Sequence, residues 1–275
     1  MNNKLDELSG MARSCSRPQP VNKFGVRGVK ALVALGIVVS ALGVAGAAHS
    51  AILAYDSANL PGYAPQPDHN WSVINGGYGY NLWTGLNDIP LGTGVDGGTY
   101  MSGVGVEGRQ VDGNWSFGLY AYGTGFDISR PLVTPMPYGR FTILTRFDLA
   151  GDGPNLINLR SANDTAAFAN GELLTFGIDG DVDPTQLCYR DAAGVHVLPS
   201  GEARGQVWQW TVNFNALSGI YSLSVTNAGG GFAMTLGGFL EAKRTTVGSF
   251  AVRNSSIGGF QNLIFDSPTF SVPPK

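Results

Sequence analysis

The stretch VWQWTVNFNALSGIYSLSVTN, residues 207–227, decides the fold class. In its first part the apolar residues take every second position: Trp208, Trp210, Val212 and Phe214. This period of two is typical of a β-strand with one buried face. The alternation returns in residues 221–226, and the connection NALSG (215–219) has the length and the glycine of a hairpin loop. The stretch therefore predicts an antiparallel hairpin whose two tryptophans face a core.

Similar alternation recurs along the chain, and helical periodicity is hard to find after residue 55. The further predicted strands are 116–122, 141–148, 156–160, 172–178, 186–190, 195–198, 232–236, 250–253 and 262–266. Turn residues separate them, for example in the run 227–231. This pattern of short strands predicts an all-β fold, a two-sheet antiparallel β-sandwich or jelly roll. It excludes a parallel sheet, because crossover helices are missing.

The N-terminus has the features of an export signal. Six basic residues and two acidic ones precede an uncharged run, Ala31 to Ala48, and small residues follow before Ala51. We predict that residues 1–50 are a secretory signal peptide, so that the mature protein is secreted and extracellular, with no membrane segment after cleavage. A membrane anchor is the alternative, because a run of about 18 apolar residues lies at the lower limit for spanning a bilayer.

The rest of the chain has the length of one domain. We assign residues 51–74 to an N-terminal extension or first strand, 75–272 to the β-sandwich and 273–275 to the C-terminal end. Without the leader, 11 basic and 18 acidic residues remain, for a formal charge of −7. This charge disfavours nucleic acid as a partner. Cys188 is the one cysteine left, so no internal disulfide forms, and we expect this thiol to be packed in a strand.

The order of several motifs resembles that of concanavalin A-like lectin and glucanase jelly-roll domains. The motifs are SFGLYA (116–121), YGRF (138–141), GIYSLSVT (219–226), FAVRN (250–254) and NLIF (262–265). Among such domains the chain looks most like exported bacterial proteins of the PEP-CTERM type, in which a Val-Pro-Glu-Pro element and a membrane tail follow the last strand. Here the sequence reads SVPPK (271–275), so the sorting tail is absent and release is expected. The resemblance implies contact with carbohydrate.

The acidic residues do not follow the pattern of a glycosidase. The resemblance implies that an enzyme of this fold would carry a Glu-x-Asp-x-x-Glu strand, in which alternation places a nucleophile and an acid on one face. The glutamates after the leader are Glu107, Glu172, Glu202 and Glu241, and none has a second acid in that register. Zinc-ligand clusters and a Gly-x-Ser-x-Gly elbow are also missing from this part of the sequence. We therefore predict no catalytic residue; a pair of carboxylates brought together from distant positions is the remaining route to a glycoside hydrolase.

Aromatic residues outside the core face are the predicted ligand-binding residues. Tyr120 and Tyr122 alternate with the apolar residues of strand 116–122, which places both on the opposite face. The glycine-rich stretch 74–84 adds Tyr78, Tyr80 and Trp83, in a composition suited to a shallow polar and aromatic site. The alternative is that these rings cover the rim of the core, with their hydroxyl groups in water.

The densest acidic cluster lies in the loop after strand 172–178. Asp179, Asp181 and Asp183 recur at every second residue, and hard cations such as calcium take several oxygen ligands from loops of this kind. A calcium site is one interpretation. A solvated connection is the other, because Gly180 and Pro184 form turns and the longer calcium-loop pattern is not met.

Two classes of function follow from these observations. The first is a secreted, non-catalytic, lectin-like module that binds a polysaccharide or a cell-surface glycan. The second is a structural protein of an extracellular matrix, which associates through the edges of its sheets without a specific small ligand.

Overall fold

The computed structural model describes residues 50–63, 71, 74–84, 89–90, 96–103, 109–148, 153–161, 172–241, 245–256 and 261–273. The predicted signal peptide, residues 1–50, lies outside these residues except for Ser50. Within the described part, no helix is long and apolar enough to cross a membrane.

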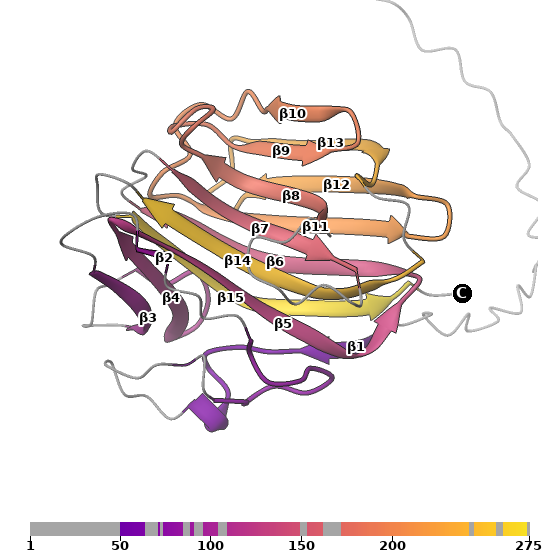
Figure 1. The fold of residues 1–275 in the computed structure, drawn as a ribbon, viewed down its shortest axis with the longest axis horizontal. Coiled ribbons are helices and arrows are strands. Elements are labelled where there is room, and N and C mark those ends of the chain that lie inside the picture. The colour runs from indigo at the N-terminus through magenta and orange to yellow at the C-terminus, as the bar shows by residue number, and fades with distance from the viewer. Residues whose placement is uncertain are drawn as a thin grey trace, which may run out of the picture. The chain divides into compact units, whose positions relative to one another are not determined.

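Two antiparallel sheets form the fold, which confirms the predicted β-sandwich (Figure 1). The eight-stranded sheet has the order β13 (Ala233–Phe239), β12 (Ile220–Asn227), β11 (Val207–Asn215), β6 (Tyr138–Asp148), β15 (Gln261–Val272), β4 (Trp115–Tyr122) and β3 (Asp96–Gly103), and β1 (Ala51–Tyr55) pairs with β15. The seven-stranded sheet has the order β10 (Gly194–Val197), β9 (Cys188–Asp191), β8 (Glu172–Asp179), β7 (Pro154–Arg160), β14 (Val247–Ser256), β5 (Thr124–Met136) and β2 (Ile89–Pro90).

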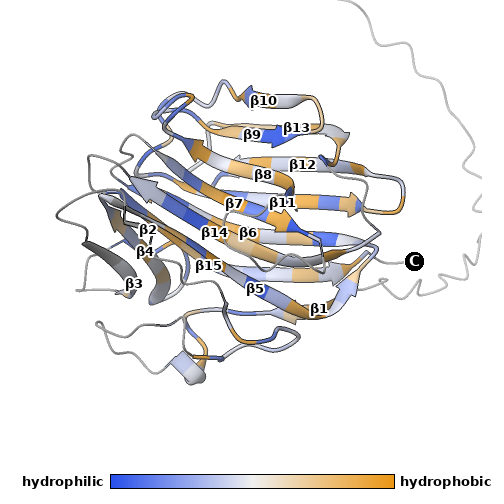
Figure 2. Ribbon diagram, viewed as in Figure 1, coloured by the Kyte–Doolittle hydropathy of each residue, from blue (hydrophilic) through white to orange (hydrophobic). Residues whose placement is uncertain are grey.

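The hairpin expected from residues 207–227 is present. Strands β11 and β12 pair antiparallel from Trp208 with Asn227 to Asn215 with Ile220. Trp208 and Trp210 are fully buried, as the alternation predicts. Figure 2 shows hydrophobic and hydrophilic residues alternating along the strands.

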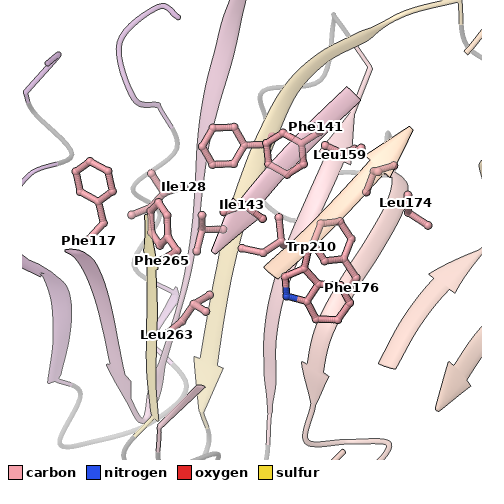
Figure 3. Packing of buried hydrophobic residues seen from close by; sticks show 14 of the residues in the cluster. Phe117, Ile128, Phe141, Ile143, Leu159, Leu174, Phe176, Trp210, Leu263 and Phe265 are labelled. Atoms are coloured by element: carbon pink, nitrogen blue, oxygen red, sulfur yellow. The ribbon is translucent and has the colours of Figure 1, made fainter. Parts of the chain in front are cut away.

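The core lies between the two sheets and is rich in aromatic rings. Trp210 of one sheet packs 4.8 Å from Phe176 of the other, and Phe117 lies 5.3 Å from Phe265 (Figure 3). Both ring pairs are tilted, and aromatic contacts at such distances stabilise a core beyond the area that they bury. Because side chains alternate along a strand, the residues between these core residues lie on the outer faces of the two sheets.

Strand β5 departs from the sequence analysis, which assigned no strand there. It runs for 13 residues and contains Pro131 and Pro135, residues that argue against a strand because proline lacks the N–H donor of a ladder. The structure places Pro131 opposite Ser249, at the point where the register of β5 and β14 shifts. The irregular pairing accommodates the missing donor.

The segment before β5 completes the core. Trp71 is fully buried, donates a hydrogen bond from Nε1 to the Gly118 carbonyl at 2.9 Å and lies 5.2 Å from Phe117. The short 3₁₀ helix η1 (Pro61–Tyr63) places the buried ring of Tyr63 against Phe117 at 4.9 Å. Tyr63 and Trp71, which precede most of the strands in the chain, are thus part of the core.

Candidate functional site

Two of the predicted ligand-binding aromatics belong to the core. Tyr80 and Trp83 are 4% and 6% exposed, so their ring faces are not available to stack on a sugar. The prediction that these two residues bind the ligand is therefore wrong. The reason is Arg130, whose guanidinium lies 5.5 Å from the centre of the Tyr80 ring and 4.9 Å from that of Trp83. The rings pack against a buried cation that also pairs with Asp56 at 3.1 Å.

No local pattern predicts that Tyr80 and Trp83 lie beside Arg130, because isolated bridges outside the regular strands bring them there. Tyr80 pairs with Leu132, and Thr84 with Ser129, so residues 80–84 run along β5. Tyr78 stays at the surface, 53% exposed, with its ring 6.3 Å from that of Tyr55.

Tyr120 and Tyr122 lie on the outer face of the eight-stranded sheet, half-buried, because Phe117, Leu119 and Ala121 face the core. Tyr100 of β3 joins them: its ring lies over Gly118, where a Cβ would come within 2.4 Å of it. The Tyr100 hydroxyl donates to Asn262 Oδ1 at 2.9 Å. We call Tyr100, Tyr120 and Tyr122 the tyrosine patch.

The outer face of the seven-stranded sheet carries a different set of residues. Arg160 and Arg253 lie there beside Asp127 and Glu172, with Arg160 Nη2 2.5 Å and Arg253 Nη2 3.2 Å from Asp127 Oδ2. Arg253 also pairs with Glu172 at 2.6 Å. Arg160 and Asp127 are fully buried. These four residues, which we call the charged network, tie β5, β14, β7 and β8 together.

Asn158 and Thr175 extend the charged network along the same face. They stand opposite each other in the β7–β8 ladder, and the Thr175 hydroxyl donates to Asn158 Oδ1 at 2.8 Å. Asn158 Nδ2 and Ser249 Oγ are buried and have no hydrogen-bond partner within the part of the chain that the structure describes. A buried polar group without a partner costs about 1–3 kcal/mol, so such groups point to a bound water or ligand.

A shallow pocket opens beside these residues on the same face. Its lining residues come from β7, β8, β9 and β10: Leu156, Thr175, Asp179, Cys188, Tyr189, Arg190 and Val195. Thr175 lines the pocket and also donates a hydrogen bond to Asn158, so it connects the pocket to Asn158 and the charged network. Tyr189 and Arg190 are half-buried and Val195 is 42% exposed, so the pocket reaches solvent.

The cysteine in this pocket is a packing residue, as predicted. Cys188 is 3% exposed, and burial raises the pKa of its thiol to about 12. Because the thiolate is the nucleophilic form, a thiol with this pKa is inert at neutral pH.

The three aspartates of the predicted calcium loop do not converge as ligands. Asp179 is buried at the end of β8, with Oδ1 accepting from the Asp181 backbone N–H at 3.2 Å. Asp183 Oδ1 accepts from the hydroxyl and backbone N–H of Thr185 at 2.7 and 2.9 Å, and these bonds lower its pKa to about 2. Across the described ranges, no three His, Cys, Asp or Glu residues form a group that could hold a metal. The donor set therefore does not fit calcium.

Asp191 of β9 lies where the two sheets meet and hydrogen-bonds to the opposite sheet. Its Oδ2 accepts from the Tyr221 hydroxyl of β12 at 2.7 Å, and its Oδ1 lies 3.1 Å from His196 Nε2. The His196 ring stacks on Tyr189 at 4.6 Å. These contacts join β9 and β10 to the opposite sheet.

The carboxylates of the charged network form ion pairs with arginines. Asp127 Oδ2 contacts both Arg160 and Arg253, and Glu172 Oε1 contacts Arg253. A glycosidase needs one carboxylic acid that donates a proton and a second, ionised carboxylate. The geometry at this face is that of an ion-pair cluster.

Sequence reasoning missed the charged network and Tyr100. A signal was present: in residues 155–160 polar Asn158 and Arg160 alternate with the core residues Ile157 and Leu159. Alternation assigns such residues to a solvated face, and only the assembled sheet shows that this face is buried.

No protein-family model matches the chain, and no curated protein is significantly similar to it. Among solved structures, lectin II from Ulex europaeus is 10% identical, with a TM-score of 0.42, covering 70% of this chain and 98% of that one. A peanut lectin bound to a nonapeptide is 14% identical, with a TM-score of 0.41 and coverages of 69% and 98%.

The exoplasmic and lumenal domain of VIP36, in a form bound to Ca²⁺ and mannose, is 9% identical, with a TM-score of 0.40 and coverages of 64% and 84%. The fold class rests on the sheet topology itself.

Proposed function

We propose that the protein is a secreted, non-catalytic module that binds a glycan at the outer face of the seven-stranded sheet. The observation that carries this proposal is the pocket on this face, where half-buried Tyr189 and Arg190 and the exposed side chain of Val195 reach solvent beside the polar residues of β7 and β8. A ligand rich in hydroxyl groups supplies both acceptors and donors to such a face.

The pocket is the point of entry in this proposal. Arg190 offers donors, Asp179 offers an acceptor, and Leu156 and Val195 provide apolar contact, so that one sugar ring finds both polar and apolar partners. Thr175 then leads from the pocket to Asn158, which is a continuous polar path along β7 and β8.

A glycan array with the purified protein tests the proposal, first with calcium and then with chelator. We expect binding to one class of glycan, and Arg190→Ala should weaken it about tenfold, the worth of one or two lost hydrogen bonds. Val197→Thr is the matched control, because Val197 is exposed on the neighbouring strand β10 and does not line the pocket. Loss of binding with chelator would instead implicate the aspartate loop.

The same array locates the binding surface. Tyr120→Ala removes one ring of the tyrosine patch and leaves the pocket unchanged. If Tyr120→Ala abolishes binding while Arg190→Ala does not, the glycan binds to the eight-stranded sheet and the proposed site is wrong.

A structural role in a matrix is the second candidate, and the edge strand β13 favours it. Its seven residues carry no charge and no proline, and Phe239 is 64% exposed beside Ile220 at 47%. Uncharged edges of this kind are able to pair with another chain. Thr235→Lys on this strand should abolish self-association in sedimentation if this role holds, and should not affect glycan binding.

A further inference from the structure

The segment 78–84 closes one side of the sandwich between β1 and β5 (Figure 1). Isolated bridges join its first residue to Tyr55 of β1 and its last residue to Ser129 of β5. We define the uncharged seam as residues 51–55, 78–84 and 131–135, because none of them is Asp, Glu, Lys, Arg or His. The charged residues next to it in the chain, Asp56 and Arg130, are fully buried and pair with each other at 3.1 Å.

Large apolar side chains are concentrated at the surface of the uncharged seam. In the described part of the chain, twelve large hydrophobic side chains are exposed, and the seam contributes five of them: Ile52, Leu53, Tyr78, Leu82 and Val133. Their exposed fractions lie between 45% and 61%. Single exposed apolar residues are ordinary, whereas a group of them without charge marks a surface that meets a protein or a membrane.

Two local features turn these side chains outward. The register of β1 and β15 shifts between Ile52 and Ala54, and this bulge leaves the consecutive Ile52 and Leu53 both exposed, where regular alternation would bury one of them. Gly79 has a φ of 76°, and a Cβ there would lie 2.1 Å from the Leu53 carbonyl oxygen. Only glycine permits this approach, which sets Tyr78 at the surface with its ring 6.3 Å from that of Tyr55.

The covalent chain connects the uncharged seam to the apolar run of the leader. Only His49 and Ser50 separate Ala48, the end of that run, from Ala51 at the start of β1. Two connecting residues reach about 10 Å at full extension, so a bilayer that holds the run lies close to β1. The basic residues before the run favour the cytoplasmic side, which leaves the sandwich on the outer side.

We propose that the uncharged seam rests on the outer surface of the membrane for as long as residues 31–48 remain attached to the chain. A few apolar side chains bind a bilayer weakly on their own, and stable attachment takes a second signal, which the apolar run supplies. Tyr55 and Tyr78 suit this position, because tyrosine rings lie at the level of the lipid headgroups. Cleavage after residue 50 would release the seam. The inference does not depend on glycan binding.

A second copy of the chain fits this surface less well than a bilayer does. A stable interface between proteins takes about 20–30 residues from each partner, which is more than the uncharged seam contains.

Quenching by brominated lipids tests the inference on the full-length chain in phosphatidylcholine vesicles. In a Cys15→Ser background a fluorophore is attached to the Val133→Cys variant, and Cys188, 3% exposed, stays unlabelled. Val197→Cys is the matched control, because Val197 is 44% exposed on β10, at the opposite edge of the sheet that contains β5. Since an interfacial side chain enters the bilayer by about 5–10 Å, we expect loss of about half of the fluorescence at position 133 and less than about a tenth at position 197.

A charge on the uncharged seam should weaken this contact. We expect Leu53→Asp to reduce the quenching at position 133 at least about threefold, because a carboxylate disfavours contact with acyl chains. Leu82→Asp repeats the test in the second segment, at a residue that is 60% exposed. Val182→Asp adds the same charge to the exposed loop between β8 and β9 and should leave the quenching unchanged. Circular dichroism verifies that each variant is folded.

The inference is overturned if positions 133 and 197 are quenched equally, or if neither is quenched. It is also overturned if folded Leu53→Asp and Leu82→Asp variants keep the full quenching, since the tether alone would then bring position 133 to the lipid. Fluorescence at position 133 that changes with protein concentration and not with brominated lipid would assign the seam to a second copy of the chain.

Discussion

The two outer faces of the sandwich have similar residue alternation but differ in burial. On the eight-stranded sheet the outward residues of β11, β12 and β13 are half-buried or exposed, and they pair locally, as Ser224 does with Thr235 at 2.8 Å. On the seven-stranded sheet every residue of β8 is buried, and the outward residues form the charged network. A polar face is therefore not always a solvated one.

The largest expected effect comes from breaking the charged network. Arg160→Leu removes the 2.5 Å contact from the buried Asp127 carboxylate and keeps the longer one to Arg253, and we expect a loss of about 4 kcal/mol in the free energy of unfolding. Denaturant titration measures this value. Arg140→Leu is the control on the other outer face, where Arg140 donates to half-buried Asn213 at 2.8 Å, and should cost less than about 1 kcal/mol. Equal losses in both variants would remove the contrast between the two faces.

A pH dependence should mark Asp266, an acid that is buried on the outer side of the eight-stranded sheet. Asp266 of β15 is fully buried under Ser57 and Ala58, which donate hydrogen bonds to it at 3.0 and 2.8 Å. Burial raises its pKa from the ordinary 3.8 of an aspartate to about 7.

The folded state therefore binds a proton that the unfolded state releases, so this stabilisation is present at low pH and is lost as the pH rises toward 7. Between pH 5 and pH 8 we expect a loss on the order of 3 kcal/mol in unfolding experiments, since one pKa unit corresponds to about 1.4 kcal/mol. Asp266→Asn should flatten this slope. A slope that persists in Asp266→Asn would assign the effect to another buried acid, such as Asp56, whose pKa burial also raises.

Thr175→Val tests the hydrogen bonds of the seven-stranded face at nearly constant volume. The change removes the donor to Asn158 Oδ1 and to Glu172 Oε2, which lies 3.2 Å away, and leaves both acceptors buried. We expect a loss of about 1.5 kcal/mol by denaturant titration. A loss near zero would show that water replaces the hydroxyl group, and hence that this face is hydrated.

Ser224→Ala is the corresponding change on the eight-stranded face and should have the smallest effect. Its hydroxyl pairs with Thr235 near the sheet edge, where water replaces the lost partner. We expect a change within about 0.5 kcal/mol in the same titration. A loss as large as that of Thr175→Val would mean that the two faces differ in residue type and not in hydration.

The sequence analysis located most strands because their alternation is local. The strands that it missed are instructive: β5 carries two prolines, and β3 contains the glycines Gly97, Gly98 and Gly103. In these segments tertiary pairing overrides weak strand propensity.

The candidate site was predicted only in part. Asp179 was placed in the calcium loop, and the structure puts it in the pocket wall beside Arg190. Tyr120 and Tyr122 lie on the outward face that alternation predicts, whereas Trp83 and Tyr80 pack around Arg130. Partners such as Asp56 and Arg130 are 74 positions apart in the chain, and no local pattern connects them.

The sequence by itself determined the all-β class, the β11–β12 hairpin and the inward faces of the main strands, because a period of two residues is a property of a single strand. Only the tertiary structure decided that Arg160, Asp127, Glu172 and Arg253 meet on one buried face, and that Thr175 joins them to a pocket. The physical reason is that burial of a polar face, and the ion pairs that compensate for it, depend on strand order.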